Sequence, residues 1–125
     1  MIKIMIAPNR YIQGPGVLKE TGKYIAHLGK KVFFMGGPTA LSIVKDRVAP
    51  SLHENSMKSA FETFSGECTR AGVAQVLEKA HKFGADVVAG VGGGRAIDTA
   101  KAVSHELGSA LVTIPTVASN DAPCS

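Results

Sequence analysis

From Asp86 to Asp98 the chain runs Asp-Val-Val-Ala-Gly-Val-Gly-Gly-Gly-Arg-Ala-Ile-Asp, which predicts a buried strand leading directly into a helix. The apolar run over Asp86–Val91 is continuous, as expected for a strand that is covered on both faces of a parallel sheet. A helix is predicted over Arg95–Leu107, with Gly108 just past its end. Its inward positions recur at helical spacing: Ala96, Ala100, Val103 and Leu107.

The rest of the chain repeats this alternation of short apolar runs and amphipathic stretches. Further strands are predicted over Lys3–Ala7, Lys31–Met35, Ser59–Phe64 and Ala110–Ile114, with a short extended piece at Tyr11–Gln13. Helices are predicted over Val17–Leu28, Thr39–Val48 and Thr69–Phe83, the second of them ending before Pro50. Strands that alternate with helices predict an α/β fold with a mostly parallel, Rossmann-like sheet and helices on both faces.

Length and composition fit one globular domain, residues 1–125. Of the residues, 45% are hydrophobic and 19% charged, and the net charge of +4 comes from scattered basic residues that form no stripe suited to nucleic acid. No apolar run reaches the length of a membrane span. Two cysteines, Cys68 and Cys124, make no disulfide framework, and with no leader peptide this predicts a cytoplasmic protein. The ending at Ser125, without a closing helix, suggests a piece of a longer protein.

The glycine loop Gly92–Gly94 is the first candidate binding site. Glycines let an anion approach the backbone, and the free N–H groups and dipole of a helix start favour negative charge, so a diphosphate fits. Arg95 can add a charge-assisted contact, and Asp98, also a candidate cofactor-binding residue, can cap free N–H groups or pair with Lys101. The loop is neither the Rossmann G-x-G-x-x-G, since Arg95 takes the third glycine's place, nor a Walker loop. The alternative is a flexible turn.

A second loop leaves the carboxyl end of the last predicted strand. Its polar residues can hydrogen-bond phosphate, ribose, carboxamide or polyol groups: Thr116, Ser119, Asn120 and Asp121. Loops from the carboxyl ends of parallel strands share one edge of the sheet, so both candidate loops are expected to face one crevice. The alternative is a polar turn with helix caps.

Two motifs carry a family resemblance. Gly90–Lys101 (Gly-Val-Gly-Gly-Gly-Arg-Ala-Ile-Asp-Thr-Ala-Lys) and Ile114–Pro123 (Ile-Pro-Thr-Val-Ala-Ser-Asn-Asp-Ala-Pro) resemble the iron-containing alcohol dehydrogenase superfamily, and within it the glycerol dehydrogenases. The resemblance spans essentially the whole chain. It implies roles for individual residues: Gly93, Gly94 and Arg95 on the cofactor diphosphate, Thr116 and Ser119 on the nucleotide, Asp121 on a substrate hydroxyl, and Ser125 near the nicotinamide.

The resemblance further implies oxidation of glycerol, or a related vicinal diol, by hydride transfer to a nicotinamide, assisted by a divalent metal, usually zinc. The family's metal ligands, an Asp and two His in a helical domain, would lie beyond Ser125. The histidines of this chain are widely separated and do not replace them: His27, His53, His81 and His105. The chain alone is therefore expected to be inactive.

The residues after the second strand leave the choice between NAD and NADP open. Many NAD-using members carry an Asp after the second strand to hold the adenosine ribose, and this chain has Gly36-Gly37 there. Gly37 can still line the ribose site through its backbone. We expect NAD, with NADP also admitted because no carboxylate repels a 2′-phosphate.

Two alternative functions remain from the sequence. One is an isolated nucleotide-binding module without turnover, and the other is a glycerol-1-phosphate dehydrogenase-like enzyme that shares the glycine loop. The Asp121-Ala122-Pro123 tail counts against the second. The expected partners are a small polyol and further copies of the full-length enzyme in a homo-oligomer, with neither nucleic acid nor a membrane.

Overall fold

The computed structural model describes residues 3–6, 10–13, 17–64 and 69–115. Its centre is a six-stranded sheet in the order β2-β1-β6-β5-β3-β4. The strands β3 (Lys31–Gly36), β4 (Lys58–Thr63), β5 (Val87–Gly92) and β6 (Ala110–Pro115) run parallel. This confirms the predicted mostly parallel α/β sheet.

A hairpin of two antiparallel strands extends the sheet beyond β6. The strand β1 (Lys3–Ile6) pairs with β6 on one side and with β2 (Arg10–Gln13) on the other. The first of these was predicted as a strand, but its antiparallel direction was not, because a four-residue strand carries no sequence signal for its orientation. The short extended piece predicted at Tyr11–Gln13 is a full strand over Arg10–Gln13.

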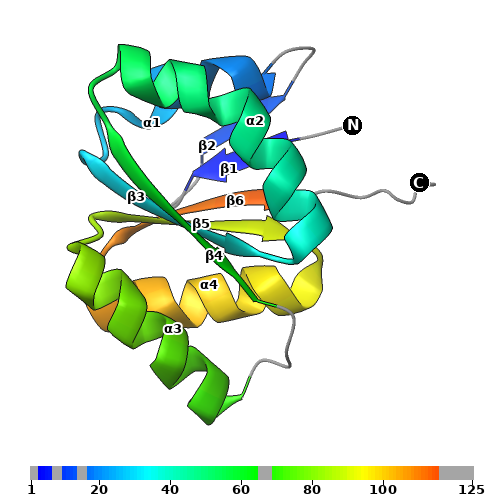
Figure 1. Cartoon of the computed structure of the whole chain (residues 1–125), viewed down its shortest axis with the longest axis vertical. Helices are drawn as coiled ribbons and strands as arrows, with labels where there is room; N and C mark the ends of the chain where they lie inside the picture. The colour runs from blue at the N-terminus through cyan, green and yellow to red at the C-terminus, as the bar shows by residue number, and fades with distance from the viewer. Residues whose placement is uncertain (1–2, 7–9, 14–16, 65–68, 116–125) are drawn as a thin grey trace.

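Helices cover both faces of the sheet (Figure 1). One face carries the 3₁₀ turn η1 (Val17–Glu20), α1 (Thr21–Ile25) and α2 (Pro38–Glu54), and the opposite face carries α3 (Arg70–Phe83) and α4 (Gly94–Leu107). Among the described residues, none of these helices has the length and apolar character needed to cross a membrane.

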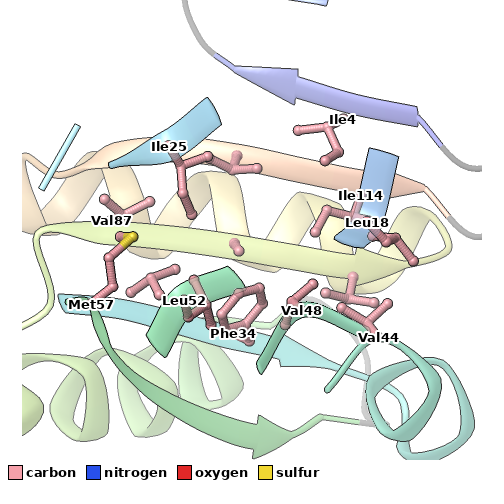
Figure 2. Close-up of a cluster of buried hydrophobic side chains, with 14 of the residues drawn as sticks. Ile4, Leu18, Ile25, Phe34, Val44, Val48, Leu52, Met57, Val87 and Ile114 are labelled. Carbon is pink, nitrogen blue, oxygen red and sulfur yellow. The ribbon is translucent and has the colours of Figure 1, made fainter. Parts of the chain in front are cut away.

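Each face has its own hydrophobic core. On the α1/α2 face, Phe34 and Val87 of the sheet pack with Val44, Val48 and Leu52 of α2 (Figure 2). On the opposite face the core is formed by the neighbouring strand positions and by α3 and α4: Phe33, Met35, Val76, Ala80, Val88, Ala100 and Val103. Every residue of β5 is buried, which explains the continuous apolar run seen in the sequence.

The prediction that the second helix ends before Pro50 is wrong. The helix α2 continues through Pro50 to Glu54. A proline inside a helix removes one hydrogen bond and costs about 3 kcal/mol. The residues after it offset that cost, because Leu52 is 2% exposed in the core and the Ser51 hydroxyl accepts a hydrogen bond of 2.8 Å from the Gly22 N–H of α1.

The predicted helix over Val17–Leu28 is also too long and too regular. It consists of the 3₁₀ turn η1 followed by a five-residue α-helix that ends at Ile25. The buried Thr21 hydroxyl donates a 2.9 Å hydrogen bond to the Leu18 carbonyl, an arrangement that competes with regular helical bonding. The apolar spacing alone could not reveal this local competition.

Candidate functional site

The carboxyl ends of the parallel strands meet along one edge of the sheet. Gly36 of β3 lies beside Val91 of β5 and Thr63 of β4, and Gly92 of β5 lies beside Pro115 of β6. From β3 the chain passes over one face through α2 to β4, and from β5 it passes over the other face through α4 to β6. The connections diverge between β3 and β5, and at such a switch point open α/β sheets bind their ligands.

The helix α4 begins at this switch point without a side-chain cap. Gly93 is its N-cap residue, with extended backbone (φ −88°, ψ −170°), and among the described residues it has no side-chain capping hydrogen bond. The first backbone bond of the helix joins the Ile97 N–H to the Gly93 carbonyl at 3.1 Å. The N–H groups of a first turn have no acceptor within the helix, and they are concentrated here together with the positive end of the helix dipole.

The helix α2 begins in a similar way on the neighbouring strand. Its N-cap is Gly37, again without a side-chain hydrogen bond, and Pro38 opens the helix. The helix α3 differs, because the Thr69 hydroxyl accepts a 3.0 Å hydrogen bond from the Gly72 N–H and caps its start. Among the described residues, the starts of α2 and α4 therefore have no side-chain N-cap hydrogen bond, whereas the start of α3 has one.

The glycines near the switch point fall into two groups, according to the space around an added Cβ atom. A Cβ added at Gly37, Gly93 or Gly94 would meet nothing within 4 Å among the described residues. A Cβ added at Gly36 would collide with the Val91 carbonyl oxygen of the next strand, and one at Gly90 would lie 2.6 Å from the Ala100 Cβ. The first group borders open space, whereas the second group lets neighbouring backbones approach closely.

Charge at this edge favours an anion. No acidic residue lies in the first turn of α2 or of α4. Arg95 follows Gly94 in the first turn of α4 and is exposed. Open backbone, helix N–H donors and a guanidinium together form the donor set that recognises a phosphate or diphosphate. The residues present therefore fit the diphosphate of a dinucleotide.

The structure corrects the expectation that Asp98 caps the helix. Because α4 begins at Gly94, Asp98 lies a full turn into the helix, beyond reach of the first-turn N–H groups, and its side chain is exposed. In the part of the chain that the structure describes, Asp98 forms no ion pair with Lys101 either. A direct contact of Asp98 with the cofactor stays a prediction.

Several predicted site residues lie outside the described residues. They are the whole second loop and its neighbours: Thr116, Ser119, Asn120, Asp121, Cys124 and Ser125. Pro115, from which this loop departs, is placed beside Gly92, so the loop leaves the sheet next to the start of α4. Cys68 also lies outside the described residues.

The described residues contain no group of three or more His, Cys, Asp or Glu side chains able to hold a metal ion. All the histidines are exposed and lie in or next to four different helices: His27, His53, His81 and His105. The arrangement of these described residues thus fits an anion, and they provide no metal centre.

Two glycines shape the site in ways that the sequence pattern did not show. Gly92 adopts a positive φ of 119°, which turns the chain from β5 toward α4 and which side chains rarely permit. Gly90 lies under α4 and was noted only as a partial match to a fingerprint. The sequence holds no local signal for this role, because it depends on the packing of Gly90 against Ala100 on another element.

Comparison with known proteins agrees with this geometry. The family model described as iron-containing alcohol dehydrogenase matches residues 8–125. The chain is 35% identical to a glycolaldehyde reductase from Halobacterium salinarum and 32% identical to a glycerol dehydrogenase from Citrobacter freundii, each over 100% of this chain and 34% of the relative. A probable glycerol dehydrogenase from Sinorhizobium meliloti superposes with a TM-score of 0.73 at 34% identity, over 86% of this chain and 29% of that one.

Each of these matches covers only part of the relative's length. The chain spans about a third (34%) of the length of the two curated relatives named above. The chain belongs to the iron-containing alcohol dehydrogenase family.

Proposed function

We propose that residues 1–125 form the cofactor-binding unit of an NAD(P)-dependent oxidoreductase that oxidises glycerol or a related vicinal diol to the hydroxyketone. One observation carries the proposal: among the described residues, α4 starts at the switch point with no side-chain cap, no acidic residue in its first turn and open space around Gly93 and Gly94. A dinucleotide diphosphate supplies the negative charge and the acceptors that this helix start lacks.

The cofactor would lie across the carboxyl edge of the sheet. With the diphosphate over Gly93, Gly94 and Arg95, the nicotinamide end points toward the loop that follows Pro115, and the adenosine end points toward Gly37 at the end of β3. In this orientation Thr116 and Ser119 contact the nucleotide and Ser125 lies near the nicotinamide. The backbone at Gly37 borders the adenosine ribose, and NAD is the preferred cofactor, with NADP admitted.

The substrate proposal rests on the relatives. Glycerol and glycolaldehyde, which the names of these two relatives give, are both small molecules in which a hydroxyl neighbours the reacting carbon. Asp121 would accept a hydrogen bond from that hydroxyl and so orient the substrate. A divalent metal, expected to be zinc and held by residues outside this chain, supplies polarisation of the substrate oxygen.

The substitution Gly94→Val tests the diphosphate site. The Cβ position at residue 94 is open, so the valine has room in the folded protein but occupies the space that the diphosphate needs. The affinity for NADH, followed by nicotinamide fluorescence, is expected to fall by at least about tenfold, while the melting temperature stays within a few degrees.

A matched control is Ala71→Val, which places the same side chain at an exposed position in the first turn of α3. That helix is capped by Thr69, so no cofactor contact is expected and the NADH affinity should equal that of the unsubstituted protein. Equal affinities in both variants would refute the diphosphate assignment. An unsubstituted full-length protein that binds neither NADH nor NADPH would refute the proposed function.

A further inference from the structure

The position of α4 on the sheet is determined by a contact between two small residues. Gly90 lies on the face of β5 that α4 covers, next to Val88 of the same core. A Cβ built on Gly90 would lie 2.6 Å from the Ala100 Cβ, 3.3 Å from the Ile97 Cα and 3.4 Å from the Ala96 carbonyl oxygen. Backbone and Cβ atoms of the helix therefore rest directly on the strand backbone.

This contact lies under the part of the helix that faces the proposed ligand. Ala96 belongs to the first turn of α4, whose N–H groups have no acceptor within the helix, and Ile97 closes the first helical hydrogen bond onto Gly93. Carbon atoms pack at about 3.5 to 4.0 Å, so a side chain at residue 90 must push the helix outward by on the order of 1 Å at Ala100, and the first turn moves with it. Hydrogen bonds lose strength over such a displacement.

We infer that the Gly90–Ala100 contact positions the first turn of α4 so that its N–H groups reach the cofactor diphosphate. Gly90 touches no cofactor itself and is a positioning residue. The inference rests on the proposed function. It adds that the contact between β5 and α4 determines how close the start of α4 lies to the sheet. Burial supports it, because Gly90 and Ala100 are both fully enclosed between strand and helix.

The substitution Gly90→Ala tests the inference in the full-length protein. The new methyl group and the Ala100 methyl group cannot both fit at 2.6 Å, so α4 must rise from the sheet. The dissociation constant for NADH, measured by nicotinamide fluorescence at a temperature where circular dichroism shows a folded protein, is expected to increase by about tenfold or more.

A second substitution provides the rescue. Ala100→Gly removes the methyl group on the helix side, so the double variant Gly90→Ala/Ala100→Gly carries one methyl group in the contact instead of two. The NADH affinity of the double variant is expected to return to within about threefold of the unsubstituted protein, although its helix is weakened by the glycine. If the double variant recovers the NADH affinity but not the stability, the loss of binding in Gly90→Ala comes from the displaced helix and not from a general loss of structure.

The substitution Gly29→Ala is the matched control. A Cβ there would lie 2.7 Å from the Asp86 Cβ, nearly the same crowding, but in the loop before Lys31, at the amino edge of the sheet. This variant is expected to lose stability while keeping its NADH affinity. Ala100→Ser adds a single oxygen to the Gly90–Ala100 contact and gives a milder test that does not depend on the folding of Gly90→Ala.

The outcomes separate the two proposals. A several-fold loss in Gly90→Ala or Ala100→Ser that Gly29→Ala lacks, with rescue by the double variant, supports the inference. Unchanged NADH affinity in Gly90→Ala and in Ala100→Ser, with normal binding by the unsubstituted protein, overturns the inference and leaves the proposed function intact. Equal losses in Gly90→Ala and Gly29→Ala also overturn it. Absence of NADH binding by the unsubstituted protein overturns the proposed function itself.

Discussion

At the scale of single residues, Gly37 is the position where cofactor preference can be changed. Its backbone is ordinary (φ −66°, ψ 157°), and an added Cβ meets nothing within 4 Å, so a side chain fits without strain. In Gly37→Asp the carboxylate would lie at the proposed ribose end, where it accepts a hydrogen bond from a 2′-hydroxyl and repels a 2′-phosphate. The ratio of NADPH to NADH dissociation constants is expected to rise by about tenfold or more.

Gly37→Asn is the control for this prediction. Asparagine has nearly the same size and caps a helix start about as well as aspartate, but it carries no charge. The preference for NADH should therefore change far less in Gly37→Asn, in parallel fluorescence titrations with NADH and NADPH. If Gly37→Asp shifts both dissociation constants by the same factor, the adenosine ribose does not lie at the end of β3.

The glycines also show which roles of single residues could be predicted from the sequence and which could not. The loop glycines were found from sequence because a strand, a glycine run and a helix follow one another within a few residues. The role of Gly90 depends on its distance from Ala100, ten positions later and on another element, which only the packed structure provides. Asp98 was assigned to the wrong turn because the helix start was predicted one residue late, at Arg95 rather than Gly94.

At the scale of elements, α2 offers a test of how tertiary contacts keep a helix intact through a proline. Pro50 is exposed within the helix and cannot donate to the Asp46 carbonyl one turn earlier. Pro50→Ala restores that donor and removes the ring's clash. After allowance for the stiffer unfolded chain that proline gives, we expect the free energy of unfolding to rise by about 1 to 2 kcal/mol.

Urea denaturation checks this prediction through an increased midpoint with an unchanged slope. NADH affinity should stay constant, because Pro50 lies near the end of α2 that is remote from Gly37. A decrease in stability would mean that the proline relieves strain in α2. The same contrast explains the prediction error: the proline was visible in the sequence, whereas the burial of Leu52 and the Ser51–Gly22 bond were not.

At the scale of the whole molecule, strand order is what creates the site. The alternating pattern predicted a parallel sheet and brought the loops after β5 and β6 to one edge. It did not predict that β3 and β5 are neighbours, which the register Gly36 to Val91 establishes. That adjacency brings the uncapped starts of α2 and α4 together, and no periodicity in the sequence encodes it, because neighbouring strands are chosen by the packing of the entire chain.

Residues 1–125 can be tested on their own, apart from the full-length protein. Both faces of the sheet carry their own core, so this segment is expected to fold and to bind NADH. Its described residues hold no group of three or more metal-ligating side chains, so with glycerol, NAD and added zinc it should form no NADH, whereas the full-length protein should. Absorbance at the nicotinamide band checks turnover, and fluorescence checks binding. Glycerol-dependent turnover by the segment would contradict a metal site outside it, and an unfolded segment would contradict its independence as a domain.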